Sequence, residues 1–249
     1  MLRSMYSGVS GMKNFQTKLD VIGNNISNVN TIGYKKSTIN FQDLMSQNMS
    51  NGGTNPMQVG LGSATSSINV VHTPGSSMST GVGTDLTVSG DGFFVVGSED
   101  NPRLTRSGSF TVDNEGFLRT TQGLNVLGAD GIPIEIDEDY RSSFVINSAG
   151  EVRVPDSEEP IAELGIVTVD NPSSLRKLGG SMYGIPANTE PTTAALAGVS
   201  IGSGQLEMSN VDLTEEFTEM IIAQRGFQAN SRTITTSDEI LQEVVNLKR

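Results

Sequence analysis

Few side chains in this sequence have the type and spacing needed for bond chemistry. The chain has one histidine, His72, followed by Thr73 and Pro74, and it has no cysteine. A serine–histidine–aspartate triad or a histidine-rich metal site would therefore depend on His72 alone, and thiolate chemistry is excluded. Because a lone histidine beside proline in a loop is usually solvated, we expect His72 to be solvated and the chain not to be an enzyme.

Two carboxylate clusters are the other candidates for chemistry. They are residues 137–139 (Asp-Glu-Asp) and the group of Asp156, Glu158 and Glu159. Either could hold a weakly bound cation, but both lack the alternating ligands and central glycine of a calcium loop. No phosphate-binding glycine motif or nucleophile elbow occurs. We therefore expect solvated acidic surfaces, and no catalytic, cofactor-binding or metal-binding residues.

The composition narrows the class of protein further. Of 249 residues, 35% are hydrophobic and 5% aromatic, and 28 are glycine, which suits short strands and turns better than one dense core. The net charge of −12 argues against nucleic-acid binding. No apolar run is long enough to cross a membrane. The first residues lack the apolar region of a cleavable signal peptide, which leaves a cytoplasmic protein or export without cleavage.

Both ends of the chain read as helices with one apolar stripe. Hydrophobic residues recur every three or four positions in 1–30 and 211–247, which is the helical spacing. A long stripe must be covered in water, so we assign it to an assembly interface, together with two asparagines from the end of the first helix. The assigned residues are Leu2, Met5, Val9, Leu19, Ile22, Asn24, Asn25, Ile26, Val29, Leu213, Phe217, Met220, Ile221, Phe227, Ile234, Leu241 and Val245.

The charges of the two ends are opposite in sign. Residues 1–36 carry five basic side chains and one acidic, whereas residues 205–249 carry four basic and eight acidic. This contrast indicates that the terminal helices meet, within one molecule or between neighbours. The simpler alternatives are chance segregation of charge and an ordinary helix pair on a monomeric domain. The acidic middle of the chain is expected to be a solvated outer surface.

The signals that begin and end the two helices are also readable. An asparagine-rich stretch, followed by Gly33, is typical of a helix end, although its amides could equally form a seam between subunits. Asp212 with Glu215 resembles a capping pair at the start of the last helix. Gly226 interrupts that helix, at a cost of about 1 kcal/mol.

Between the helices the pattern changes to short strands joined by turns. Residues 86–96, 110–118 and 144–154 each hold two hydrophobic runs separated by Asp, Asn, Ser or Gly, which is a hairpin signal. The predicted fold class is α+β: long N- and C-terminal helices that form a coiled-coil-like inner domain, and a central, mainly antiparallel β-domain. The expected parts are an N-terminal helix of the inner domain (1–33), an extended linker (34–80) with a loop over 46–54, an outer β-domain (81–185), a return linker (186–205) and a C-terminal helix of the inner domain (206–249).

Four segments carry a resemblance to a known family. DVIGNNISNVNTIGYKKS (20–37) resembles the N-terminal signature of bacterial flagellar rod and hook proteins, and residues 206–249 resemble their C-terminal signature. GTDLTVSGDGFFVV (83–96) and RLTRSGSFTVDNEGFLRT (103–120) are similar to the family's β-domain. The resemblance covers nearly the whole chain in the family's order.

The resemblance implies a function and a location. Members polymerise into a hollow helical axial structure that transmits motor torque, with the terminal segments as an inner tube and the β-domain outside. The implied partners are copies of this chain, adjacent rod, hook or hook-junction proteins, and the flagellar type III export machinery, without nucleic acid, membrane insertion or a cofactor. The implied location is the bacterial flagellum, in the hook or basal body, reached without signal cleavage.

Short motifs favour one member of that family. Gly23-Asn24-Asn25-Ile26 and Val245-Asn246-Leu247 look more like a hook protein. Residues 37–204, however, leave little room for the further outer domain that many hook proteins carry. We therefore expect a short hook protein, with the distal rod protein as the alternative. A rival from another class is a secreted binding module, such as an adhesin, which would be a monomer with helices ordered in isolation.

Overall fold

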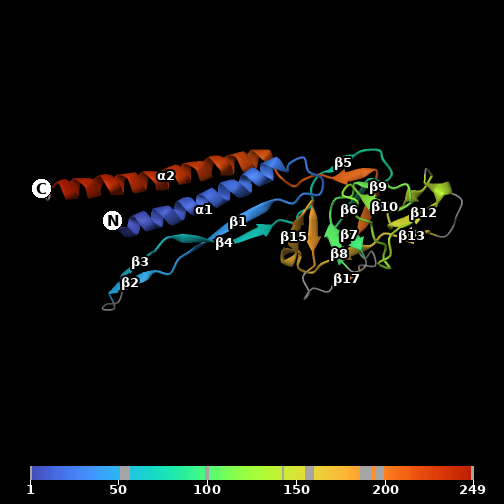
Figure 1. The fold of residues 1–249 in the computed structure, drawn as a ribbon, viewed down its shortest axis with the longest axis horizontal. Coiled ribbons are helices and arrows are strands. Elements are labelled where there is room, and N and C mark those ends of the chain that lie inside the picture. Colours follow the sequence, from blue (N-terminus) through green and yellow to red (C-terminus); the bar gives the residue numbers. More distant parts are fainter. Residues whose placement is uncertain are drawn as a thin grey trace. The chain divides into compact units, whose positions relative to one another are not determined.

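The computed structural model describes residues 2–50, 57–98, 101–141, 143–154, 160–185, 192–193 and 199–247. The chain forms two compact units (Figure 1). The helix unit consists of Met1–Ser27, Ser37–Val71 and Val211–Arg249, and the β-unit consists of Asn28–Lys36 and His72–Asn210. Two terminal helices and a central, mostly antiparallel β-region confirm the predicted α+β class.

Two long helices and two strand pairs make up the helix unit. Its elements are α1 (Leu2–Ser27), β1 (Ser37–Asp43), β2 (Gln47–Ser50), β3 (Met57–Val59), β4 (Ser63–Val70) and α2 (Leu213–Asn246). The Asp212 side chain caps α2 by accepting hydrogen bonds from the backbone N–H groups of Thr214, at 2.7 Å, and Glu215, at 3.3 Å. This confirms the start of the last helix that the sequence predicted.

Four strands, β1 to β4, lie within residues 34–80, where the sequence predicted an extended linker. β1 pairs with β4, and β2 pairs with β3, both antiparallel. The side chains of α1 contact the first pair: Asn14 donates a hydrogen bond to the Ser63 hydroxyl at 2.8 Å, and the Phe15 ring meets the edge of Phe41. The linker prediction was wrong for these strands because they contain few apolar residues and pair through their backbones, so the sequence shows little strand-like alternation. Of the loop expected over 46–54, residues 51–54 lie outside the described residues.

Many short strands build the β-unit. Its elements are β5 (Ser77–Ser79), β6 (Leu86–Ser89), β7 (Gly92–Ser98), β8 (Asn101–Thr105), β9 (Phe110–Val112), β10 (Leu118–Thr120), the 3₁₀ turn η1 (Glu138–Tyr140), β11 (Val145–Ile146), β12 (Glu151–Arg153), β13 (Ala162–Glu163), β14 (Ile166–Thr168), the 3₁₀ turn η2 (Pro172–Ser174), β15 (Arg176–Gly179), β16 (Met182–Gly184), β17 (Thr192–Thr193), β18 (Ser200–Ser203) and β19 (Gln205–Glu207). The largest sheet has the strand order β15-β16-β8-β7-β14-β17. The hairpins predicted around residues 114 and 148 are present as β9–β10 and β11–β12. The hairpin predicted around residue 91 was wrong, because β6 pairs with β18 and β7 pairs with β8 and β14.

Strands that come late in the chain return to pair with the first strands of the β-unit. β18 pairs with β6, and β19 pairs with β5. Residues 199–207 are therefore structural parts of the β-unit, although the sequence analysis placed most of them in a return linker. These residues were hard to recognise as strands because Ser, Gly and Gln make up most of them, with Val199, Ile201 and Leu206 as the buried apolar residues. Residues 186–191 and 194–198 of the expected linker lie outside the described residues.

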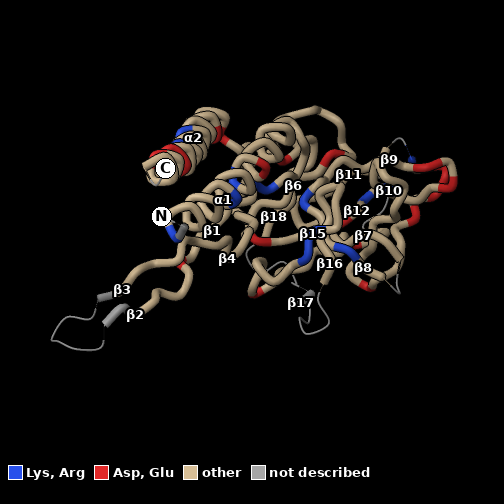
Figure 2. The backbone as a smooth tube through the Cα atoms, turned by 60° about the vertical axis from the view of Figure 1, so that its left-hand side comes forward, with Lys and Arg blue, Asp and Glu red and all other residues tan. Residues whose placement is uncertain are grey.

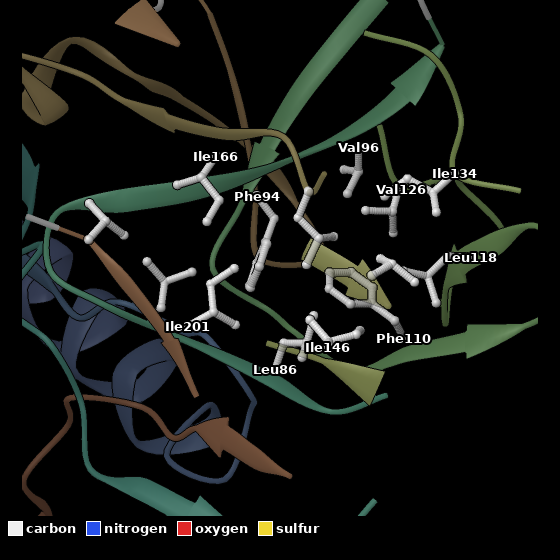
Figure 3. Close-up of a cluster of buried hydrophobic side chains, with 14 of the residues drawn as sticks. Leu86, Phe94, Val96, Phe110, Leu118, Val126, Ile134, Ile146, Ile166 and Ile201 are labelled. Carbon is white, nitrogen blue, oxygen red and sulfur yellow. The ribbon is translucent and has the colours of Figure 1, made fainter. Parts of the chain in front are cut away.

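The hydrophobic core lies inside the β-unit. Figure 3 shows Leu86, Phe94, Phe110 and Ile146 converging from different strands, with the Phe94 and Phe110 rings edge to face at 5.1 Å between centroids. Burial of such side chains is the main stabilising contribution to a fold of this size. The β-unit therefore contains what it needs to fold.

Candidate assembly surfaces

The helix unit has almost no core of its own. Among the residues that the structure describes, its buried hydrophobic side chains are Ile22, Val211 and Ala223. Along α2, the buried residues are Glu216, Ala223 and Ser237, none of which is a large apolar side chain. A 34-residue helix that buries so little apolar area gains little stability from its own subunit.

Small and polar residues line the contact between α1 and α2. A Cβ atom added to Gly226 would lie 2.5 Å from Cζ of the Phe15 ring, and one added to Gly11 would meet the Asn230 side chain at 3.0 Å. Gly226 therefore makes room for Phe15, which gives a physical reason for a glycine in the middle of a helix. Lys18 also forms an ion pair with Glu219. The two terminal helices thus meet within one subunit, as the opposite charges of the chain ends indicated.

The predicted apolar stripe of α2 divides between two faces. Met220, Ile234 and Leu241 are partly covered in the subunit. The second group stands in solvent and consists of Leu213, Phe217, Ile221, Phe227 and Val245, with Phe217 50% and Ile221 59% exposed. Ile222, Ile240 and Val244, which the sequence analysis did not assign, are also exposed. Contiguous exposed apolar side chains of this kind mark an interaction surface.

The residues assigned on the first helix are divided in the same way. Ile22 and Asn25 are buried, Val9 and Asn24 are exposed, and Met5, Leu19, Ile26 and Val29 are intermediate. The side chain of Leu2 lies outside the description.

Asn25 makes its hydrogen bonds inside the subunit. Its side chain donates to the Ser37 carbonyl at 2.9 Å and accepts from the Ser37 N–H at 3.0 Å, while its amide also donates to the Glu216 carboxylate at 3.2 Å. The two bonds to Ser37 hold the end of α1 against the start of β1. The third bond gives the buried Glu216 carboxylate a hydrogen-bond donor. Asn25 therefore has a role within the subunit, which the sequence could not distinguish from a seam between subunits.

A buried ionic cluster lies in the β-unit and was not anticipated. Lys35 is fully buried and donates hydrogen bonds to the Glu207 carboxylate and, at 2.8 Å, to the Thr73 carbonyl. Glu207 also accepts from the Gly75 N–H at 2.9 Å, and Arg106 lies 3.5 Å from its other oxygen. Burial lowers the pKa of both Lys35 and Arg106, and the Glu207 charge opposes that shift in each. Removing one partner would leave an uncompensated buried charge.

The cluster fixes two connecting segments to the β-unit. Lys35 belongs to residues 28–36, which follow α1 in the chain, and Glu207 precedes α2. Residues 28–36 are also held by a hydrogen bond from the Ser181 hydroxyl to the Ile32 carbonyl, at 3.0 Å, and by Lys177, which packs over the Tyr34 ring. No sequence signal pointed to this cluster, because Lys35 and Glu207 are 172 residues apart and Arg106 belongs to a third segment.

His72 is partly buried against two aromatic rings, whereas the sequence suggested a fully solvated side chain. Its ring lies 5.4 Å from the centroid of Tyr183 and 5.8 Å from that of Phe93. Burial lowers the pKa of His72 from its ordinary 6.5 to about 4, and the nearby charges of Lys35 and Arg106 act in the same direction. His72 is therefore neutral near pH 7 and has a packing role.

We expect the β-unit to lose stability on acidification because of His72. A folded pKa below the unfolded value means that the contribution is fully present above pH 6.5 and falls as the pH drops towards 4. After allowance for the partial exposure of the ring, the loss is about 1–2 kcal/mol. Urea unfolding at several pH values checks it, with His72→Gln as the comparison that removes this contribution and leaves the carboxylate titrations. Identical pH profiles for the two proteins would contradict the assignment.

Of the two acidic clusters, the structure describes only residues 137–139. Within the described residues, no group of three or more His, Asp or Glu side chains could hold a metal ion. Residues 137–139 lie at η1 and are exposed, while Asp156, Glu158 and Glu159 fall outside the described residues. None of the described helices is long and apolar enough to span a membrane.

Three family models match consecutive parts of the chain. The model described as "Flagella basal body rod protein" matches residues 5–35, "Flagellar hook protein FlgE/F/G D1 domain" matches 87–154, and "Flagellar basal body rod FlgEFG protein C-terminal" matches 203–247. The first contains most of α1, the last contains all of α2, and the middle one lies in the β-unit.

Individual relatives extend over the whole chain. The flagellar basal-body rod protein FlgG of Bacillus subtilis (strain 168) is 51% identical over 265 aligned residues, with all of both chains covered. The FlgG of Borreliella burgdorferi is 36% identical over 268 residues, again with full coverage of both. The flagellar hook protein FlgE of the same organism is 28% identical over 441 residues, with full coverage of both.

Two terminal helices and an exposed apolar helix face are features expected of a subunit that assembles with neighbours. The chain belongs to the flagellar basal-body rod and hook protein family. Its relatives are structural proteins of the flagellum and not enzymes.

Proposed function

We propose that this chain is a distal rod subunit of the flagellar basal body, which polymerises into a hollow helical structure that transmits motor torque. The rod proteins align along the full length with few added positions, whereas the hook protein needs an alignment of 441 residues to cover this chain of 249. The preference for a short hook protein, drawn from short terminal motifs, is therefore replaced by its alternative.

The observation that carries the proposal is the missing core of the helix unit. α1 and α2 meet mainly through small and polar residues, while Leu213, Phe217 and Ile221 face outward. Neighbouring copies that cover this face would supply the apolar burial that one subunit lacks. In this proposal the two helices form a coiled-coil-like inner tube, the β-unit lies outside, and contacts repeat head to tail along the helix.

The remaining partners follow from the same proposal. Besides copies of itself, the subunit would contact the adjacent rod, hook or hook-junction proteins at the two ends of its segment. It would reach the basal body through the flagellar type III export machinery without signal cleavage. Relatives named as rod and hook proteins support this location.

Electron microscopy of a deletion strain tests the proposal. We expect basal bodies with an arrested rod, and full rods after complementation with the intact gene. A complete rod that lacks only the hook would identify a hook subunit instead. Normal flagella in the deletion strain would overturn both the rod and the hook assignment.

Gly226→Ala is expected to impair assembly although alanine favours helices. The added methyl meets the Phe15 ring at 2.5–2.8 Å, and such overpacking costs about 1–3 kcal/mol, against a helix-propensity gain of about 1 kcal/mol. The amount of subunit in purified basal bodies measures the effect. Gly23→Ala is the matched control, because no atom lies within 4 Å of its added Cβ. Equal incorporation of both variants would show that the α1–α2 contact does not require Gly226.

A further inference from the structure

One edge of the β-unit presents an exposed leucine with two arginines beside it. Arg176 of β15 is in register with Gly184 of β16, which is in register with Arg103 of β8. Residues directly opposite on antiparallel strands point to the same face, so both arginines flank Gly184 on one face. A Cβ at Gly184 would lie 3.3 Å from Cδ1 of Leu178, which is 46% exposed. We call Arg103, Arg176 and Leu178 the basic patch.

A second site of the β-unit is concave and acidic. A groove of about 300 Å³ is lined by residues 128–130, 132–135 and 161–163. Its open apolar side chains are Ile132, 59% exposed, and Ile161, 40% exposed. The carboxylates around it are those of Asp130, Glu135 and Glu163. We call this site, defined by its two isoleucines and three carboxylates, the acidic groove.

The charges of both sites are available for a partner. Where the structure is described, Asp130, Glu135 and Glu163 form no ion pair, and neither do Arg103 and Arg176. Other basic residues of the β-unit are already engaged. Arg119 pairs with Asp113 and Glu115, Arg153 pairs with Glu151, and Lys177 lies over Tyr34.

The two sites lie on different sides of the β-unit. β15 is an end strand of the six-stranded sheet, whereas the groove includes β13, an end strand of a separate three-stranded sheet. Figure 1 shows β13 and β15 at opposite sides of the β-unit, and Figure 2 shows basic positions beside β15, β16 and β8. A contact that repeats head to tail requires two different, complementary patches that face away from each other.

We propose that the basic patch of one copy docks into the acidic groove of a neighbouring copy. Leu178 would enter the groove between Ile132 and Ile161, and Arg103 and Arg176 would pair with its carboxylates. Copies of a chain with net charge −12 repel one another, and this contact offsets that repulsion locally. The inference rests on the proposed function and adds a second contact, between β-units, to the one made by the helix faces.

Cross-linking tests this contact directly because the chain has no cysteine. Basal bodies are purified from cells carrying Leu178→Cys with Ile132→Cys and treated with a short bismaleimide. We expect a ladder of covalent oligomers. The control replaces Ile132→Cys by Val145→Cys, an exposed position outside the groove, and should give none. Assembled rods without a ladder, or with the same ladder in the control, overturn the docking and leave the rod assignment intact.

If the double-cysteine variant does not assemble, charge-reversal variants test the proposed docking instead. Arg176→Glu and Glu163→Arg should each reduce incorporation into basal bodies about fivefold or more, and the double variant should restore at least half. A double variant as poor as the singles overturns the docking. Absence of the unaltered chain from basal bodies would instead overturn the proposed function, and this inference with it.

Discussion

Phe217→Asp is expected to prevent almost all rod assembly while leaving the β-unit folded. Phe217 lies half exposed on the outward face of α2, and a neighbouring copy would bury it in the assembled rod. Losing the aromatic ring removes about 1.5–3 kcal/mol of burial per subunit, and a buried carboxylate adds a desolvation cost. Since 1.4 kcal/mol corresponds to tenfold, we expect at least about a hundredfold less subunit in basal bodies. Electron microscopy and immunoblots of purified basal bodies measure it.

Gln228→Asp is the matched control for this substitution. It introduces the same charge on the same helix at an exposed polar position, and we expect near-normal assembly. Urea unfolding of the β-unit should be the same in both variants. Full-length rods built from Phe217→Asp subunits would show that the outward face of α2 is not the assembly surface.

Glu207→Ala is expected to destabilise the β-unit by about 3–5 kcal/mol. It leaves Lys35 buried without its carboxylate partner, and it deprives Arg106 of the nearby charge and the Gly75 N–H of its acceptor. Urea unfolding followed by near-ultraviolet circular dichroism measures the change, because aromatic residues such as Tyr183 lie within the unit.

The control for Glu207→Ala is the same substitution in a more exposed ion pair. Glu151 pairs with Arg153 in a solvent-accessible position, so Glu151→Ala should cost no more than about 1 kcal/mol. Glu207→Gln keeps an acceptor for Gly75 and should fall between the two. Equal, small losses for Glu207→Ala and Glu151→Ala would mean that the buried cluster contributes little to the fold.

The helices and two of the three hairpins could be predicted because their signals are local. The apolar spacing of three and four residues marked α1 and α2, the Asp212 side chain marked the start of α2, and turn residues marked the β-domain. The spacing alone could not show which apolar residues of α2 face the inside of the subunit and which face outward. Met220 and Ile234 turn towards the inside of the subunit while Phe217 and Ile221 turn outward, and only the partner helix decides which is which.

The features that escaped prediction depend on contacts between distant residues. The pairing of β1 with β4 relies on backbone hydrogen bonds, and polar strands carry little alternation. Lys35 and Glu207 meet across 172 positions, so neither carried a signal beyond its charge. His72 was expected to be solvated because its sequence neighbours suggest a loop, whereas Phe93 and Tyr183 enclose it from elsewhere in the chain.

Hydrogen exchange of α2 before and after assembly tests the central claim most directly. The outward face of α2 should be covered only by other copies, so amides in residues 213–247 should exchange rapidly in the dilute full-length protein and become strongly protected in isolated rods. Amides of the β-unit core, such as those of Phe94 and Leu118, should be protected in both. Equally strong protection of α2 in the dilute monomer and in the rod would contradict this account.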